Sequence, residues 1–90
     1  MRPLIVIGNW KMNGNLASNE DWIKTVARGM ESGMPSGRKF AVCPPFPYLT
    51  QCASLIKEHS LAFLSLGAQD ASADIAGAYT GEVAASSLNE

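Results

Sequence analysis

Three short apolar runs recur along the chain, and each ends at small or polar residues. The first run covers residues 4–7, the second is centred on residues 40–42, and the third fills much of residues 61–68. Runs without polar alternation are typical of strands buried on both faces, as in a parallel sheet covered by helices. We therefore expect strands at residues 3–8, 39–43 and 61–68, with both faces of the first strand buried.

The segment after the first run has helical periodicity. Four apolar residues recur at the spacing of one helix face: Trp22, Ile23, Val26 and Met30. Ser18 followed three residues later by Asp21 resembles a capping box. These features predict a helix over residues 19–32, with its apolar face packed on the sheet and with Glu20 and Asp21 in the first turn.

A second helical pattern follows Pro47, which suits a first helical turn. Its apolar positions match a helix face: Leu49, Cys52, Ala53 and Ile56. His59, the chain's single histidine, falls at the carboxyl end of this helix. That end faces away from the carboxyl ends of the strands, so we interpret His59 as a capping or solvated residue rather than a catalytic base.

Residues 69–81 follow the third run without a helical or an alternating pattern. A connection of this length in an α/β unit is usually functional or mobile. Ile75 and Tyr79 suggest a contact surface there, and the alternative is that the Tyr79 ring folds back under its own loop. Thr80 is expected to cap a further helix, which begins with Val83.

Composition narrows the function classes. The hydrophobic fraction of 47% and the charged fraction of 17% describe a folded chain, and ninety residues make one domain at most. Seven scattered Lys and Arg residues offer no basic patch for nucleic acid, and no apolar run approaches a membrane span. The first run is too short for a signal peptide, so we expect a cytoplasmic location.

The two cysteines, Cys43 and Cys52, fit no zinc motif by their spacing. In a reducing compartment both are expected to be free thiols. Cys43 ends the second strand and could be reactive, although a packing role is favoured. We expect no metal and no cofactor.

The richest chemistry follows the first apolar run, between Gly8 and Gly14. Asn9 and Lys11 stand at the expected carboxyl end of a buried parallel strand, where α/β proteins place ligand chemistry. Alternation along an extended backbone would put both side chains on the same side. An amide and an ammonium converging on one point suit an oxyanion or a phosphate, whereas the alternative is a solvated turn with a surface lysine.

These seven residues, Gly-Asn-Trp-Lys-Met-Asn-Gly after a short hydrophobic strand, closely resemble the opening of the triosephosphate isomerases. Two later stretches stand in the order that this family shows: Cys-Pro-Pro at residues 43–45, and residues 66–70 leading to Gly-Ala-Tyr-Thr-Gly-Glu at residues 77–82. The resemblance runs over the whole chain, and its first and last motifs are specific.

The resemblance implies an α/β fold, the eight-stranded (β/α)8 barrel of about 250 residues. Residues 1–90 would cover about the first three β/α units, as the amino-terminal portion of one barrel domain. The implied reaction interconverts dihydroxyacetone phosphate and D-glyceraldehyde 3-phosphate through an enediolate. Asn9 and Lys11 match the family's substrate-binding pair, with the Lys11 ammonium near the substrate phosphate and the enediolate oxygen as a catalytic group.

The resemblance also implies a homodimer. Thr80 matches the tip residue of a loop that enters the neighbouring subunit, and Gln69 matches a residue at the base of that loop. With Tyr79, these residues form the expected interface, carried by residues 69–81. The family's catalytic histidine and base glutamate match nothing in these ninety residues, which alone are expected to be inactive.

Two other interpretations stay open. The chain could be a non-catalytic barrel fragment that acts only as a folding or association unit. It could also be part of a phosphate-binding barrel with other chemistry, in which case both specific motif matches would be coincidences.

Overall fold

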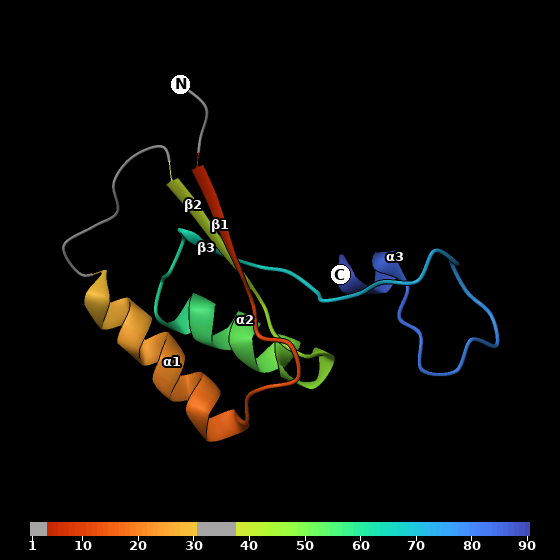
Figure 1. The fold of residues 1–90 in the computed structure, drawn as a ribbon, viewed down its shortest axis with the longest axis horizontal. Helices are drawn as coiled ribbons and strands as arrows, with labels where there is room; N and C mark the ends of the chain where they lie inside the picture. The colour runs from red at the N-terminus through yellow and green to blue at the C-terminus, as the bar shows by residue number, and fades with distance from the viewer. Residues whose placement is uncertain (1–3, 31–37) are drawn as a thin grey trace.

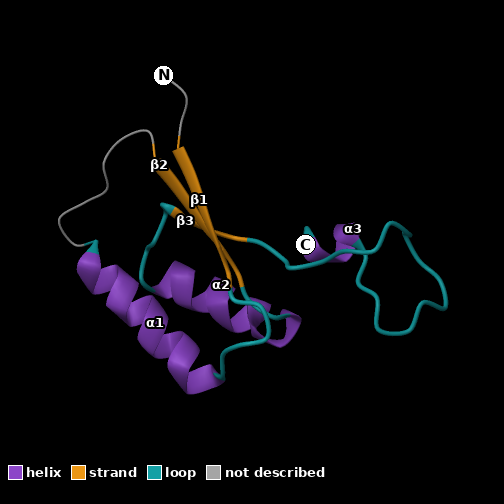
Figure 2. Ribbon diagram, viewed as in Figure 1, coloured by secondary structure: helices purple, strands orange, loops and turns teal. Residues whose placement is uncertain are grey.

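The computed structural model describes residues 4–30 and 38–90. Strands and helices alternate along the chain (Figure 1), and Figure 2 separates them by type. In order they are β1 (Leu4–Asn9), α1 (Leu16–Gly29), β2 (Arg38–Cys43), a 3-10 turn η1 (Phe46–Tyr48), α2 (Leu49–Glu58), β3 (Leu64–Leu66) and α3 (Ala85–Leu88). The expected order of strand, helix, strand, helix, strand, long loop and short helix is confirmed.

The three strands form one parallel sheet in the order β1-β2-β3. β2 lies in the centre, with Asn9 of β1 opposite Cys43 and with Phe40 opposite Leu64 of β3. Because all strands run in the same direction, their carboxyl ends meet at one edge of the sheet. This edge collects the residues that follow each strand.

The helices α1 and α2 pack side by side against one face of the sheet (Figure 2). The core between the layers is built from five buried residues: Ile23, Val42, Leu55, Leu61 and Leu64. Burying each such side chain stabilises the fold by roughly 1.5–3 kcal/mol. The Trp10 and Trp22 rings extend this core in an edge-to-face arrangement, with centroids 5.3 Å apart. The expected apolar face of the first helix thus lies on the sheet.

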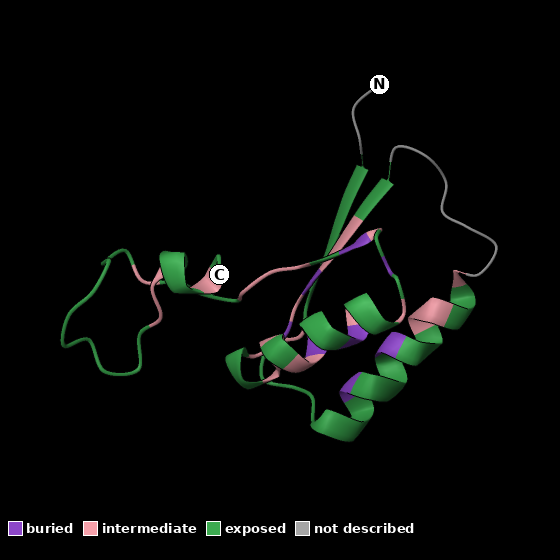
Figure 3. Ribbon diagram, turned by 180° about the vertical axis from the view of Figure 1, so that it is seen from behind, coloured by how far each residue is buried: buried purple, intermediate pink, exposed green. Residues whose placement is uncertain are grey.

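The expectation that both faces of β1 are buried is wrong for this chain. Every residue of β1 is exposed, with Ile5 and Ile7 at 57% and 64% (Figure 3). The reason is positional, since β1 is an edge strand and both helices cover the same face. Alternation points Ile5 and Ile7 to the opposite face, which no described helix covers.

Helix α1 begins three residues earlier than its sequence predicts. Asn15 is the N-cap: its side-chain oxygen accepts from the Ser18 N–H at 2.8 Å, and Ser18 Oγ accepts from the Asn15 N–H at 3.1 Å. The capping box is therefore Asn15 with Ser18, not Ser18 with Asp21, because Asn caps as well as Ser. The first turn then holds no acidic residue. The helix ends at Gly29, and the expected end at residue 32 lies outside the described residues.

Strand β3 is shorter than expected, because the end of α2 takes up its first residues. Ser60 adopts a left-handed φ of 54°, and the Leu61 N–H donates to the Ile56 carbonyl across that turn. This is the Schellman pattern, usually signalled by glycine and built here on serine. Leu61 is consequently a core residue of the turn rather than part of the strand.

Residues 67–84 contain no helix and no regular strand, as expected. The Ser72 N–H donates to the Val83 carbonyl at 2.7 Å, and Ser72 and Ala84 form a parallel bridge that closes this loop at its base. Thr80 lies in a turn in which the Glu82 N–H donates to the Tyr79 carbonyl and Gly81 has a φ of 86°. The expected cap at Thr80 is therefore wrong, because helix α3 begins only at Ala85.

The long loop and α3 extend away from the sheet and its two helices (Figure 1). The radius of gyration is 14.6 Å, whereas a compact domain of ninety residues has about 12 Å. The described chain is therefore more open than an ordinary globular domain of this length.

Candidate functional site

The carboxyl edge of the sheet places Lys11 directly after β1. Lys11 has a left-handed φ of 55°, which is uncommon for a residue with a side chain and costs of order 1–3 kcal/mol. The Lys11 N–H donates to Asn9 Oδ1 at 2.8 Å. The chain thus turns sharply at the one cation of this edge and is held there by a side chain from the end of the strand.

This turn changes the expected relation between Asn9 and Lys11. Strand geometry ends at Asn9, so alternation no longer decides where the Lys11 side chain lies. The two residues are joined instead by the hydrogen bond from the Lys11 main chain to the Asn9 amide oxygen. Since that bond uses the oxygen, the Asn9 amide nitrogen remains a donor for a ligand.

The rest of the β1–α1 loop is held by local contacts. Asn13 Nδ2 donates to the Trp10 carbonyl at 2.9 Å, and Gly14 adopts a φ of 115°. A β-carbon on Gly14 would lie 2.7 Å from Asn19 Oδ1, so the loop approaches α1 too closely for any larger residue. Asn19 is itself buried, and its Nδ2 donates to Gln51 Oε1 at 3.0 Å.

Gln69 connects the loops that follow all three strands. Its Nε2 donates to the Lys11 carbonyl at 2.9 Å and to the Cys43 carbonyl at 2.8 Å. The Cys43 carbonyl also accepts from the Trp10 N–H at 3.1 Å. Sequence analysis placed Gln69 only at an interface and missed this role, because one glutamine in a loop gives no local pattern.

The charge at this edge belongs to Lys11. Within residues 4–30 and 38–90 the ion pairs reduce to Lys24 with Glu20, a surface pair at 3.1 Å. Lys11 is exposed and thus has no carboxylate partner among the described residues. An ammonium is a compact point charge with three donors, which suits a phosphate or a developing oxyanion.

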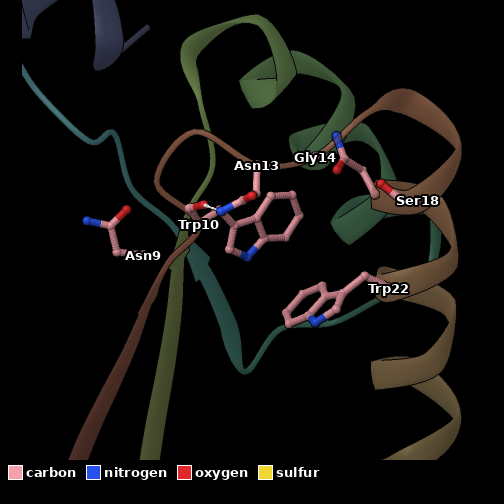
Figure 4. Close-up of a pocket in the computed structure, with 7 residues that line it drawn as sticks. Asn9, Trp10, Asn13, Gly14, Ser18 and Trp22 are labelled. Atoms are coloured by element: carbon pink, nitrogen blue, oxygen red, sulfur yellow. Dashed lines mark hydrogen bonds between the residues drawn. The ribbon is translucent and has the colours of Figure 1, made fainter.

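A cavity of about 400 Å³ lies between the β1–α1 loop and helix α1 (Figure 4). Its lining residues are Asn9, Trp10, Asn13, Gly14, Ser18, Asn19 and Trp22. The two indoles form much of its wall, and Lys11 does not line it. The cavity therefore borders the Lys11 turn without containing the cation, and it is not by itself an anion site.

The predicted interface residues lie apart from Lys11 in this chain. Tyr79 and Thr80 belong to the protruding loop, which extends away from the sheet (Figures 1 and 3). The Tyr79 ring packs over Gly77, where a β-carbon would lie 2.7 Å from Tyr79 Cε2, yet 52% of Tyr79 stays exposed. Both sequence alternatives are thus partly true: the ring folds onto its own loop and also presents a surface, beside Ile75 at 85% exposure.

Other candidate residues are structural. His59 caps the carboxyl end of α2, where its N–H donates to the Leu55 carbonyl, as its sequence position predicts. Cys43 and Cys52 are free thiols, and burial raises the pKa of the Cys52 thiol by desolvation. Cys43 Sγ packs against Gly67. The packing role favoured for Cys43 is consistent with this contact.

Two further searches concern the described residues only. No group of three or more His, Cys, Asp or Glu side chains lies together as a metal site. None of the helices in this part of the chain has the length and apolar character needed to cross a membrane.

Comparison with known proteins identifies relatives over the whole chain. The family model for triosephosphate isomerase matches residues 4–90. Curated triosephosphate isomerases from Polynucleobacter asymbioticus and Polynucleobacter necessarius are 86% and 83% identical over 90 residues, and one from Cupriavidus pinatubonensis is 48% identical.

These alignments cover 100% of this chain but only 36%, 36% and 34% of those three relatives. The chain therefore spans about a third of the length of the proteins that it matches. What the relatives are named for belongs to chains about three times as long.

Proposed function

We propose, on the premise that this chain belongs to the triosephosphate isomerase family, that it is the amino-terminal portion of a triose-phosphate isomerase. Residues 1–90 would form about the first three β/α units of a single (β/α)8 domain. The complete enzyme would interconvert dihydroxyacetone phosphate and D-glyceraldehyde 3-phosphate without a cofactor, in glycolysis and gluconeogenesis in the cytoplasm.

The observation that carries this proposal is the family match together with the position of Lys11. A cation with no described carboxylate partner follows a parallel strand in a strained, doubly held turn. Backbone strain of this kind persists where the surroundings over-determine it, and it clusters at functional sites. The carboxyl edge of parallel strands is also where barrel enzymes place their chemistry.

In the proposed mechanism, Lys11 stabilises negative charge. The ammonium binds the substrate phosphate, and it stabilises the enediolate oxygen as that oxygen gains charge towards the transition state. A contact that strengthens towards the transition state raises turnover, whereas equal binding of ground and transition states does not. Asn9 would position the substrate through its free amide nitrogen, while its oxygen holds the Lys11 N–H.

The base and the electrophile of the reaction would come from outside these ninety residues. No histidine or glutamate of this chain corresponds to them, since His59 caps the far end of α2. The proposal therefore assigns binding and charge stabilisation to this portion, and proton transfer to the remainder of the barrel.

The proposal includes a homodimer through residues 69–81. Its support is the exposure of Ile75 and Tyr79 on a loop closed at its base. Two-fold symmetry would bring the same loop of each subunit to the interface. The alternative, a fragment that acts only as a folding or association unit, has no specific observation in its favour.

The test is isomerase activity in the full-length protein, measured in both directions with triose phosphates. Lys11→Ala should lower turnover by about a hundredfold to a thousandfold, as loss of one donor to an oxyanion does elsewhere. Lys24→Ala is the matched control, since it removes a lysine that is paired on the surface of α1. Full activity in Lys11→Ala, or none in the unaltered protein, would refute the proposal.

A further inference from the structure

The two peptide groups that flank Lys11 are both held by side chains. The peptide before it donates its N–H to Asn9 Oδ1 at 2.8 Å and accepts from Asn13 Nδ2 at the Trp10 carbonyl, at 2.9 Å. The peptide after it has its carbonyl held by Gln69 Nε2 at 2.9 Å. A φ rotation at Lys11 would break at least one of these contacts.

Of these three holding residues, Gln69 alone is distant in sequence. Asn9 and Asn13 lie within two or three residues of the groups that they hold, whereas Gln69 is 58 residues from Lys11. The same Nε2 also donates to the Cys43 carbonyl, at the end of β2. Gln69 therefore fixes the turn relative to the sheet, which the local contacts cannot do.

We infer that Gln69 is a positioning residue for Lys11. Its amide holds the Lys11 carbonyl against the end of β2, keeps the left-handed turn in place, and so sets where the ammonium lies. This role goes beyond the expected place of Gln69 at a dimer interface, and it rests on the proposed function of Lys11. A misplacement of about 1 Å in a catalytic group can cost about a hundredfold in rate, so the effect is measurable.

The principal variant is Gln69→Met in the full-length protein, because Met keeps the length of the side chain and removes both donated hydrogen bonds. We expect kcat/KM to fall by about tenfold to a hundredfold. Gln69→Asn is the second variant, in case Gln69→Met folds poorly. It retains the amide but is one methylene shorter, so it cannot reach both carbonyls, and its activity should lie between the two.

Gln51→Met is the matched control. Gln51 Nε2 donates to the Leu16 carbonyl at 2.7 Å, so this variant also removes an amide-to-carbonyl bond between distant segments. It does so away from Lys11, between α2 and the start of α1. A purely structural effect would lower the unfolding temperature in both variants, whereas positioning should lower kcat/KM only in Gln69→Met.

A double-mutant cycle separates positioning from an independent contribution. If Gln69 acts through Lys11, adding Gln69→Met to Lys11→Ala should change kcat/KM by less than about threefold. Full additivity of the two losses would overturn the inference. So would unaltered kcat/KM in Gln69→Met, or an equal loss in Gln51→Met.

Two measurements distinguish the inference from its neighbours. If the loss in Gln69→Met accompanies subunit dissociation and disappears at high protein concentration, Gln69 acts through the interface and the inference is wrong. A crystal structure of Gln69→Met reports on the turn independently of activity. We expect Lys11 to leave the left-handed region there, and an unchanged turn would refute the clamp even if the unaltered protein proved not to be an isomerase.

Discussion

The Sγ atom of Cys43 lies 2.9 Å from the point where a β-carbon on Gly67 would sit. The Gly67 N–H also donates to the Val42 carbonyl at 2.9 Å, so the backbone beyond β3 is drawn against the end of β2. Gly67 is therefore required for its small size, and this contact brings the segment leading to Gln69 close to the Lys11 turn.

Gly67→Ala should lower the free energy of unfolding of the full-length protein by about 1–3 kcal/mol, the usual cost of overpacking. Urea titration measures this change. Gly29→Ala is the control, because a β-carbon there meets nothing within 4 Å and alanine favours a helix. Cys43→Ala should restore part of the loss in Gly67→Ala, and equal stability of the two glycine variants would contradict the close contact.

Lys11→Arg should retain the positive charge and still lose most of the activity. The guanidinium is larger and planar, and it spreads its charge over three nitrogens, whereas the ammonium is a point charge. Turnover should fall by at least about tenfold, because a displaced charge no longer meets the oxyanion. Steady-state kinetics with both triose phosphates measures this change, with Lys24→Arg as control. Wild-type turnover would show that charge alone is sufficient.

Tyr79→Asp combined with Thr80→Asp should give a monomer with little activity. Two carboxylates would be placed in the proposed contact between loops, and buried unpaired charges oppose association. Sedimentation velocity at the assay concentration measures the oligomeric state. Asp74→Asn serves as the control, since it changes the charge of the same loop without adding a carboxylate. A tight dimer in the double variant would place the interface elsewhere.

The ninety residues produced alone should not catalyse the isomerisation and should lack rigid packing. They supply a binding cation without a base, and β1 exposes Leu4, Ile5, Val6 and Ile7 along an unpaired edge. Mass spectrometry should first establish the length, after which the activity assay and amide exchange are run. Strong amide protection in an active monomer would contradict this expectation.

Asn15→Ala should destabilise the full-length protein by about 1 kcal/mol through loss of the α1 cap. Asp21→Ala should have a much smaller effect, although its spacing from Ser18 suggests a capping box. Thermal unfolding of both variants measures the difference. If Asp21→Ala were the more damaging of the two, the helix would begin where the sequence pattern first suggests.

The order of elements was predictable from sequence, because it depends on runs of residues. Apolar runs indicated all three strands, and helical spacing placed Trp22 and Ile23 against the sheet. Boundaries were less predictable, because single side chains set them. Asn15 competes with Ser18 for the cap, and Ser60 takes a left-handed turn that glycine usually marks.

The site was predictable only in part. A cation after a buried strand pointed to Lys11, and its family motif supported this interpretation. The hydrogen bond from Gln69 joins residues 58 positions apart, so no local pattern could reveal it. The exposure of β1 was missed for a related reason, since an apolar run does not show which of its faces other elements will cover.

The protruding loop is closed at its base by main-chain atoms alone. The Ser72 N–H reaches the Val83 carbonyl, and no side chain takes part in that bond. Residues 73–82 can therefore change identity without removing the bond that fixes the two ends of the loop. Evolution can then vary partner preference at the tip largely independently of the demands of the sheet, so related subunits could diverge into pairs that no longer recognise one another while keeping the same catalytic edge.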